Sequence, residues 1–244
     1  MLALATVASA AEISVVSSGG FAPAYKALAP GFEKSTGDTL KSAWGPSMGD
    51  TPNTIPHRLE RGEAIDVVIM VGDSLDKLVK EGKVEPASAV LLARSKVALA
   101  VREGAPIPDI STVEALKQTM LKAKSIAYSD SASGTYISKV LIPKLDLAEA
   151  LKDKARMIPA EPVGSVVARG EAEIGFQQLS ELKPIKGIHI VGLIPEDVQK
   201  VTLFSAGIVK GAKNPEGAKA LLKYLASPQS AKVIDETGLE AATH

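Results

Sequence analysis

The chain has 244 residues, of which 45% are hydrophobic and 23% are charged, and this composition is typical of a globular protein with one or two hydrophobic cores. Basic and acidic residues both number 28, so no net positive field attracts nucleic acid, and aromatic residues make up only 4%. The chain has no cysteine and only three scattered histidines, which excludes disulfides, thiolate chemistry and a histidine-spaced zinc site. We therefore expect no nucleic-acid partner, no metal and no cofactor.

The first ten residues have the character of the end of an export signal. They form an apolar run that closes on Ala8-Ser9-Ala10, the small-x-small pattern that signal peptidase prefers. A positively charged start is missing, so an ordinary apolar strand or helix is the alternative. We expect residues 1–10 to be the remnant of a signal peptide and the protein to be periplasmic. No later run is long and apolar enough to span a bilayer.

Strand-like and helix-like patterns alternate along the rest of the chain, in the order of an α/β protein with crossover helices. The patterns predict strands at 12–17, 39–44, 65–71, 95–102, 125–128, 155–158, 172–176, 188–191 and 201–210. They predict helices at 21–36, 53–61, 73–81, 111–120, 135–144, 163–169, 213–225 and 228–236. Pro30 is expected to break the first helix locally, because proline lacks the N–H that the turn needs. Gly37, Gly62 and Gly82 each follow a helical pattern where a left-handed C-cap falls.

Two long β-rich passages interrupt this alternation. The first runs from Val84 to Asp109 and ends in the proline-marked GAPIPD, and the second runs from Val198 to Ala212. Each suits a chain that crosses from one domain to another. We expect two α/β lobes joined by two crossing strands, the first from 11–94 plus 205–244 and the second from 95–204. A cleft between two lobes is a common place for a small-molecule site.

Four polar turns follow predicted strands and carry hydroxyl groups and small residues. In an open α/β sheet, ligands bind beyond the carboxyl ends of the strands, where helix N-termini offer unpaired N–H groups and a partial positive charge. One such turn is weak evidence, because strand-to-helix turns need caps and bends in any case. Four of them, from both halves of the chain, indicate an anion site between two lobes. The turns are SSGG (17–20), WGPSMGDTPNT (44–54), VGDS (71–74) and YSDSASGTY (128–136).

A short predicted helix near residue 57 carries His57, Arg58 and Arg61. Charged clusters of this kind usually form a solvated helix face. The alternative is that His57 or Arg58 faces a carboxylate in the cleft, with Asp50 and Thr51 in the preceding loop as further polar candidates. The motifs GxxxxGK[ST], GxGxxG, GxSxG and HExxH are all absent from the sequence, which argues against nucleotide binding, serine hydrolysis and zinc-dependent proteolysis.

Four segments resemble, in this order, the molybdate-binding family of type II periplasmic solute-binding proteins over essentially the whole mature chain. They are ISVVSSGGFAPAYKALAPGFEKSTGDTL, HRLERGEAIDVVIMVGDSLDKLVKEGKV, SDSASGTYISKVL and VARGEAEIGFQQLSEL, and the parts RGEAIDVVI and GEAEIGF are the most specific. The resemblance implies the two-lobed type II fold and a small anion held in the cleft by hydroxyls and backbone amides. It also implies an ABC permease as a possible partner and a cleft that works in a monomer.

The chain departs from the family pattern at ligand-binding positions. Gly20 stands where the family begins its first helix with a serine, and Gln178 stands where the family has a tyrosine. These changes favour an anion larger than molybdate, satisfied by amide and hydroxyl donors plus a cation. The residues expected to bind it are Ser17, Ser18, Gly19, Gly20, Ser47, Met48, Val71, Ser133, Gly134, Thr135, Gln177, Gln178 and Arg58.

The chain is similar, in length and segment order, to members of this family that isomerise aconitate. That similarity implies an allylic proton shift between trans- and cis-aconitate without a cofactor. A base would remove a proton next to one carboxylate, the charge would spread as a dienolate, and the proton would return at the other end. The candidate bases are His57, Asp50 and Tyr136, and the sequence does not select among them. The alternative is a binding protein that delivers a small polycarboxylate, or an oxyanion such as molybdate, to an ABC transporter.

Overall fold

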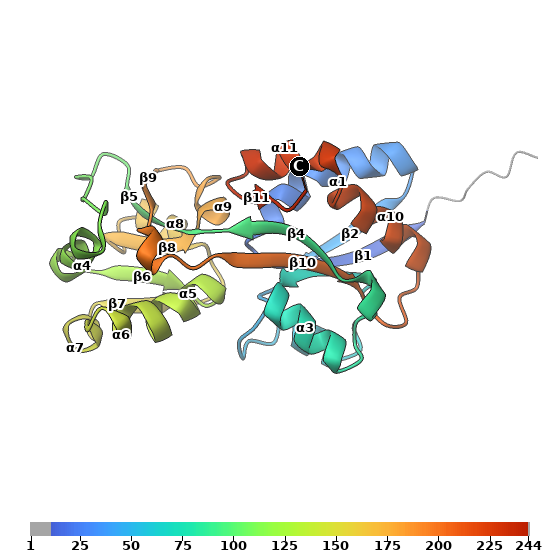
Figure 1. Cartoon of the computed structure of the whole chain (residues 1–244), viewed down its shortest axis with the longest axis horizontal. Coiled ribbons are helices and arrows are strands. Elements are labelled where there is room, and N and C mark those ends of the chain that lie inside the picture. Colours follow the sequence, from blue (N-terminus) through green and yellow to red (C-terminus); the bar gives the residue numbers. More distant parts are fainter. Residues whose placement is uncertain (1–10, 244) are drawn as a thin grey trace, which may run out of the picture.

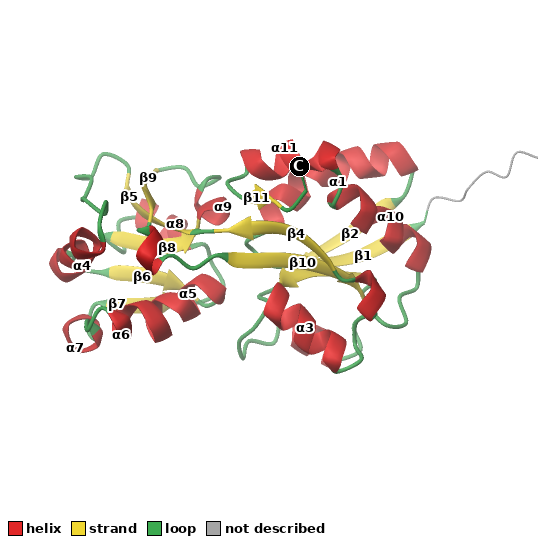
Figure 2. Ribbon diagram, in the orientation of Figure 1, coloured by secondary structure: helices red, strands yellow, loops and turns green. Residues whose placement is uncertain are grey.

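The computed structural model describes residues 11–243 and divides them between two α/β lobes that lie side by side (Figure 1). Each lobe is built on its own sheet, and helices cover both faces of each sheet (Figure 2). The two-lobed α/β fold class is therefore confirmed. The expected export signal at 1–10 lies outside the described residues. Within that described part, no helix combines the length and the apolarity that crossing a membrane demands.

The first lobe contains a six-stranded sheet in the order β11-β4-β10-β3-β1-β2. Strands β1, β2 and β3 run parallel, whereas β10 runs antiparallel to both β3 and β4. The strands are β1 (Glu12–Ser17), β2 (Thr39–Trp44), β3 (Val67–Val71), β4 (Val90–Ser95), β10 (Thr202–Ile208) and β11 (Glu240–Ala241). The helices are α1 (Ala22–Thr36), α2 (Ile55–Glu60), α3 (Gly72–Lys80), the 3-10 turn η1 (Pro86–Ser88), α10 (Pro215–Leu225) and α11 (Pro228–Glu236).

The second lobe contains a five-stranded sheet in the order β7-β6-β8-β5-β9. Strand β6 runs parallel to β7 and β8, whereas β5 runs antiparallel to β8 and β9. The strands are β5 (Val97–Arg102), β6 (Ile126–Ser129), β7 (Ala155–Ile158), β8 (Ile174–Gln178) and β9 (Ile188–Leu193). The helices are α4 (Val113–Lys122), α5 (Ala132–Tyr136), the π-helical turn η2 (Ile137–Leu141), α6 (Ile142–Lys144), α7 (Ala148–Leu151), α8 (Val163–Ala168), α9 (Leu179–Leu182) and the 3-10 turn η3 (Glu196–Val198).

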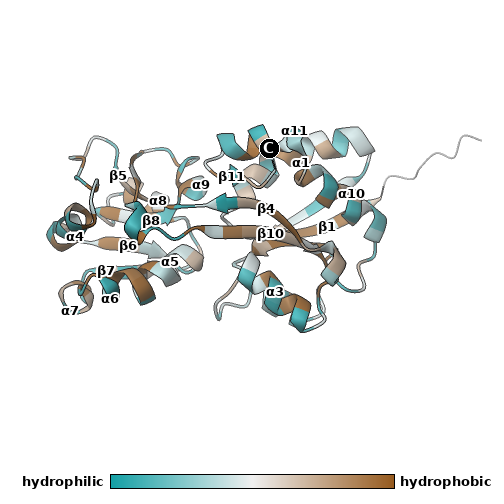
Figure 3. Ribbon diagram, viewed as in Figure 1, coloured by the Kyte–Doolittle hydropathy of each residue, from teal (hydrophilic) through white to brown (hydrophobic). Residues whose placement is uncertain are grey.

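Strand β3 shows why the first lobe needs helices on both faces of its sheet. All its residues are buried. Val67 and Ile69 pack in the core that α1, α10 and α11 complete, whereas Val68 and Met70 pack in the core formed with α2 and α3. A strand covered on both faces is apolar throughout rather than alternating, as its sequence VVIMV is. In Figure 3 the hydrophobic stretches accordingly follow strands such as β1 and β10.

Two segments carry the chain between the lobes. The first is Lys96, which lies between β4 and β5. The sequence predicts one strand at 95–102, whereas the structure has two strands in this passage, β4 in the first sheet and β5 in the second. The second segment leads from η3 into β10. Gln199 joins the two, since its side chain accepts a hydrogen bond from Val97 N at 2.8 Å and donates to Val97 O at 3.0 Å.

Several local predictions can now be compared with the structure. Helix α1 runs unbroken through Pro30, contrary to expectation, because Pro30 and Lys26, whose carbonyl loses its partner, are both exposed to water. The left-handed conformation predicted for three glycines is confirmed, with φ of 81° at Gly37, 72° at Gly62 and 70° at Gly82. The short elements β11, α7 and α9 were not predicted, and neither was β4 as a strand of its own.

Candidate functional site

A cavity of about 460 Å³ lies between the two lobes. The ends of β1, β2 and β3 and Phe204 of β10 form its wall on the first lobe, and the ends of β6 and β8 form its wall on the second. In both sheets these are the carboxyl ends of parallel strands, where ligands bind in open α/β folds. The cavity is therefore the candidate functional site.

The SSGG turn after β1 contains a hydroxyl group that is unpaired within the described part of the chain, on Ser18, a residue that lines this cavity. Ser18 is held by a hydrogen bond from its N–H to Ile69 O at 2.8 Å, but its buried Oγ has no hydrogen-bond partner among residues 11–243. Buried polar groups are normally paired, so an unpaired one on a cavity wall is a candidate ligand contact. The next two positions are tightly packed, because a Cβ on Gly19 would overlap Glu181 Oε1 and a Cβ on Gly20 would overlap the Phe204 ring.

The turns after β2 and β3 are tied together beneath the cavity. Ser47 Oγ accepts a hydrogen bond from Val71 N at 2.9 Å, and both residues line the cavity. Next to them, Lys26 Nζ lies 4.5 Å from the centroid of the Trp44 ring, in a cation–π contact. Lys26 is the one cation among the described residues that line the cavity. The first lobe thus offers a positive charge and hydroxyl groups from separate turns.

A cluster of serines closes the end of β6 in the second lobe. Ser129 Oγ lies 3.0 Å from Ser131 Oγ and 2.9 Å from Ser133 Oγ, and it also accepts a hydrogen bond from Gly134 N at 3.2 Å. Gly134 packs so closely on Ser129 that a Cβ there would overlap the Ser129 carbonyl oxygen. Ser129 and Ser131 reach the cavity wall, whereas Ser133 and Gly134 hold the turn in shape.

The two glutamines at the end of β8 have different partners. Gln177 Oε1 accepts a hydrogen bond from Val163 N at 2.9 Å. Gln178 accepts a hydrogen bond from Ser95 Oγ at 2.8 Å and donates one to Thr202 Oγ1 at 3.1 Å. Ser95 ends β4 and Thr202 begins β10, so Gln178 bridges the two segments that cross between the lobes. Both glutamines line the cavity, and Gln178 also links the cavity wall to these crossings.

Glu181, on the short helix α9 that follows β8, also lines the cavity. Its side chain keeps some exposure through the cavity but is surrounded by protein atoms of both lobes. Burial raises the pKa of its carboxyl to about 7, a hydrogen bond with Gln177 opposes this rise, and the charge of Asp130 adds to it. Sequence reasoning missed this residue. The available signal was an acidic residue one turn beyond a strand end, in the segment GFQQLSEL.

The other two acids on the cavity wall have partners that hold them in place. Glu161 accepts two hydrogen bonds of 3.1 Å from the Arg169 guanidinium. Asp130 Oδ2 accepts a hydrogen bond from Ala160 N at 3.0 Å. Within residues 11–243 no three or more histidine, aspartate or glutamate side chains gather in a way that would hold a metal ion.

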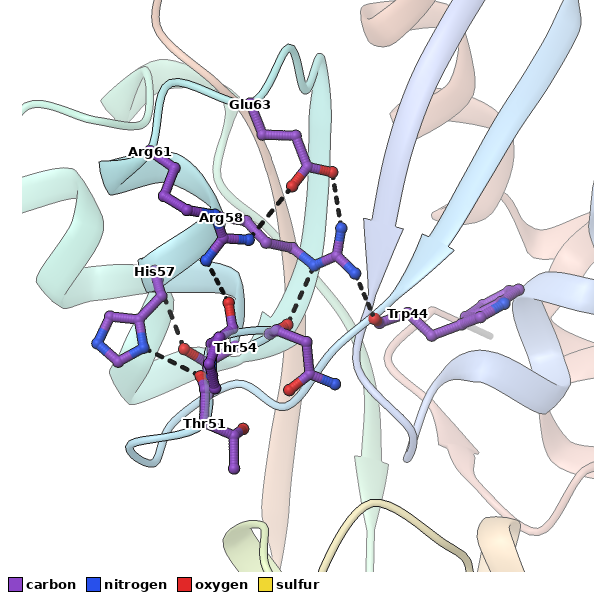
Figure 4. A network of polar contacts seen from close by, with 9 residues as sticks. Trp44, Thr51, Thr54, His57, Arg58, Arg61 and Glu63 are labelled. Carbon is purple, nitrogen blue, oxygen red and sulfur yellow. Dashed lines mark hydrogen bonds and ion pairs between the residues drawn. The ribbon is translucent and has the colours of Figure 1, made fainter.

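The charged residues of α2 form a separate network (Figure 4). Arg58 donates to Asn53 O at 3.0 Å, to Glu63 Oε1 at 2.6 Å and to Trp44 O at 3.1 Å. His57 Nδ1 lies 3.0 Å from Thr51 O, and in Figure 4 its ring lies at the far side of the network from the Trp44 indole. The network fixes the loop between β2 and α2, and through it the position of the cavity wall.

The structure brings some of the expected site residues together and leaves others apart. Tyr136 donates its hydroxyl to Val198 O at 2.6 Å and packs against the core of the second lobe, and burial raises its pKa. Those that line the cavity are Ser18, Gly19, Gly20, Ser47, Val71, Gln177 and Gln178. Those that lie outside its lining are Ser17, Met48, Asp50, His57, Arg58, Ser133, Gly134, Thr135 and Tyr136.

Comparison with known proteins gives a consistent result. The family described as bacterial extracellular solute-binding protein matches residues 13–240. The chain is 57% identical over 228 residues to an aconitate isomerase of a Pseudomonas species, covering 93% of this chain and 87% of that protein. It is 29% identical to the molybdate-binding protein of Azotobacter vinelandii, covering 96% and 92%. The solved structure of the periplasmic molybdate-binding protein of Azotobacter vinelandii matches with a TM-score of 0.76 at 22% identity, covering 93% and 98%. The resemblance to the molybdate-binding family is confirmed.

Proposed function

We propose that this chain, which belongs to the bacterial extracellular solute-binding protein family, is an isomerase that interconverts trans- and cis-aconitate in the periplasm. The observation that carries this proposal is the 57% identity to an aconitate isomerase over 93% of the chain. The site agrees with it, because a cavity of about 460 Å³ falls in the range of pockets that take small organic molecules.

The cavity also carries the donors that a tricarboxylate requires. Lys26 offers a positive charge, and the Ser18 hydroxyl has no partner within the protein. The N–H groups of Gly19 and Gly20 donate to no acceptor among residues 11–243. Donors from the first lobe and from the serine turn of the second lobe together suit a ligand with several carboxylates, such as aconitate, clamped between the lobes.

The reaction needs a proton to be moved and a negative charge to be held. Loss of a proton from the methylene carbon of aconitate leaves an allyl anion whose charge spreads onto the adjoining carboxylates. Return of the proton at the other end of the allyl system completes the shift, without any change of oxidation state. Preorganised donors that meet the developing charge lower the barrier to such a step. The turn at 17–20 is the proposed place for them.

A second candidate function is capture of a small anion for an ABC permease. The observation that favours it is the fold, which this chain shares with a periplasmic molybdate-binding protein at a TM-score of 0.76. One fold serves many functions, so the fold alone does not decide between binding and catalysis.

A proton NMR time course of the purified protein with trans-aconitate in D₂O separates the two functions. Citrate and molybdate serve as binding controls. The isomerase proposal expects cis-aconitate signals that grow in proportion to protein concentration. Broadened trans-aconitate lines without conversion would instead establish a transport receptor. Preference for molybdate over both tricarboxylates would contradict the polycarboxylate assignment altogether.

A further inference from the structure

We propose that Glu181 is the catalytic residue that moves the proton between the two ends of the allyl system, an assignment that rests on the isomerase activity proposed above. Three features of the structure support it. They are the place of α9 between the lobes, the surroundings of the carboxyl group, and the engagement of the other acidic groups.

Helix α9 belongs to the second lobe but makes hydrogen bonds to the first. Ser180 Oγ donates to Gly20 O at 2.7 Å, and Lys183 Nζ donates to Glu236 O at 2.8 Å. Between these two contacts, Glu181 Oε1 occupies the space that a side chain on Gly19 would fill. The carboxyl group therefore lies against the SSGG turn, where the proposed anion donors are. The contacts that hold α9 against the first lobe therefore also position this carboxyl group.

The surroundings of Glu181 suit a group that both takes and returns a proton. Burial raises its pKa to about 7, so the carboxylate and the carboxylic acid are both populated near neutral pH. Proton transfer is most efficient when the pKa of the catalytic group lies near the working pH. The other charged groups on the cavity wall are Asp130, whose charge raises this pKa further, Glu161, which is paired with Arg169, and Lys26.

The proposed step balances in protons and electrons. The Glu181 carboxylate accepts the proton from the methylene carbon of aconitate, and the electron pair of that C–H bond delocalises over the three allyl carbons and their carboxylates. The neutral carboxyl then returns the proton to the other terminal carbon, where a new C–H bond forms and the double bond has moved. Glu181 ends as it began, and no oxidant, reductant or cofactor takes part.

The other candidate bases are placed less favourably for this step. His57, Asp50 and Tyr136 lie outside the residues that line the cavity. Glu161 is held by Arg169, and Asp130 already accepts a hydrogen bond from Ala160 N. Glu181 is thus the acidic group of the cavity wall that both lobes enclose.

The test compares Glu181→Gln with the wild-type protein and with Glu149→Gln, the same substitution in the same lobe at a side chain that is 87% exposed on α7. General acid–base catalysis contributes roughly 10²- to 10⁴-fold, so Glu181→Gln should lower kcat by about that factor. Binding of trans-aconitate, measured by calorimetric titration, should stay within about threefold, because glutamine fills the same space. Glu149→Gln should match the wild-type protein in both measurements.

A pH profile separates a catalytic role from a structural one. The wild-type kcat/KM should rise with pH through a midpoint near 7, because the carboxylate is the active form of Glu181. Glu181→Asp keeps a carboxylate but withdraws it from the reacting carbon, so it should retain a pH-dependent activity about 10- to 100-fold below wild type. This variant also decides the matter if Glu181→Gln does not fold.

The outcomes distinguish this inference from the function on which it rests. If the wild-type protein does not convert aconitate, the proposed function fails, whatever Glu181 does. If the wild-type protein converts aconitate and Glu181→Gln does so within about threefold, the isomerase stands and Glu181 is not its base. An unchanged rate and pH profile in Glu181→Asp would overturn the assignment in the same way.

Discussion

Glu181 and His57 are both acid–base side chains on short helices, yet their surroundings differ in every respect that matters for catalysis. The His57 side chain is 38% exposed, its Nδ1 lies 3.0 Å from Thr51 O, and its Nε2 lies 3.9 Å from a Glu60 carboxylate oxygen. Glu181 is enclosed between the lobes and touches the cavity. The contrast teaches that an acid–base residue type does not by itself identify a catalytic base. Enclosure at the ligand site raises the pKa of the Glu181 carboxyl to about 7.

The polar groups around His57 have hydrogen-bond partners within the protein, whereas a hydroxyl group near Glu181 has none among residues 11–243. In the α2 network the arginines donate to backbone carbonyls and to Glu63, so their donors are used within the protein (Figure 4). At the SSGG turn the Ser18 hydroxyl has no partner among the described residues. Saturated polar networks stabilise a fold, whereas an unpaired donor on a cavity wall is available to a ligand. The predictions below test this difference.

Among variants that leave Glu181 itself unchanged, the largest effect is expected from Gly19→Ala. The added methyl group would overlap Glu181 Oε1, so the carboxyl must move or the lobes must stay further apart. A displacement of about 1 Å at a reacting group costs roughly 100-fold, and we expect a loss of that size in kcat/KM with little change in thermal stability. Gly72→Ala is the control, because a methyl group there meets its nearest neighbour, Ser205 Oγ, at an ordinary 3.5 Å. Equal activity in the two variants would contradict a close fit between Glu181 and the turn.

The next effect is expected from Ser18→Ala. Its hydroxyl has no partner in the described structure, so its removal should cost no stability in the ligand-free protein. A hydrogen bond to a charged group contributes about 1.5–3 kcal/mol, and KM for aconitate should rise roughly 10-fold or more.

Ser230→Ala is the matched control for Ser18→Ala. Ser230 is also buried in the first lobe, but its hydroxyl donates to Tyr224 O at 2.7 Å. We expect this variant to lose about 1 kcal/mol of stability in urea unfolding while KM stays unchanged. A Ser18→Ala variant that loses stability but keeps its KM would show that the hydroxyl is structural.

The third effect is on stability as a function of pH. The pKa of Glu181 rises from 4.5 to about 7 on folding, so between these values the native protein holds a proton that the unfolded chain has lost. Stability of the ligand-free protein should therefore fall as pH rises from about 4.5 to about 7 and then level off.

Glu181→Gln, which does not titrate, removes this contribution. It should equal the wild-type protein near pH 4 and exceed it by about 2 kcal/mol near pH 8, less than 1.36 kcal/mol per pKa unit would give, because water in the cleft screens the charge. Urea unfolding of both proteins at several pH values measures the difference. Parallel stability profiles would mean that the Glu181 pKa is not raised.

The sequence predicts much of the fold because most elements have a clear period. Strands such as 12–17 and 39–44 match the structure residue for residue, and a glycine-containing turn follows each of them. The sequence does not reveal that the chain passes from one sheet to the other at Lys96, because the two apolar strands on either side form one run of hydrophobic residues. The short helix α9 is missed for a related reason, since four residues are too few to show a repeat of the helical period.

The site is predicted in outline but not in its chemistry. The sequence identifies the turns at the ends of β1, β2, β3 and β6, because turn composition and position after a strand are local properties of the sequence. The Glu181 carboxyl lies against Gly19 of the first lobe and near the charge of Asp130 in its own lobe, and both residues are far from it along the chain. Local patterns do not contain that information, so the sequence alone does not select a base among His57, Asp50 and Tyr136.

The smallest effect is expected from His57→Gln. The ring contacts a loop carbonyl and lies apart from the cavity lining, so kcat and KM should stay within about twofold of the wild-type values. Glutamine can donate to Thr51 O in place of the ring, and the stability should change by less than about 1 kcal/mol. Steady-state kinetics across pH 5–9 check the first point, because the rise of kcat/KM through pH 7 should persist in this variant, and urea unfolding checks the second. Loss of the rise in kcat/KM near pH 7 would instead assign the role of the base to His57.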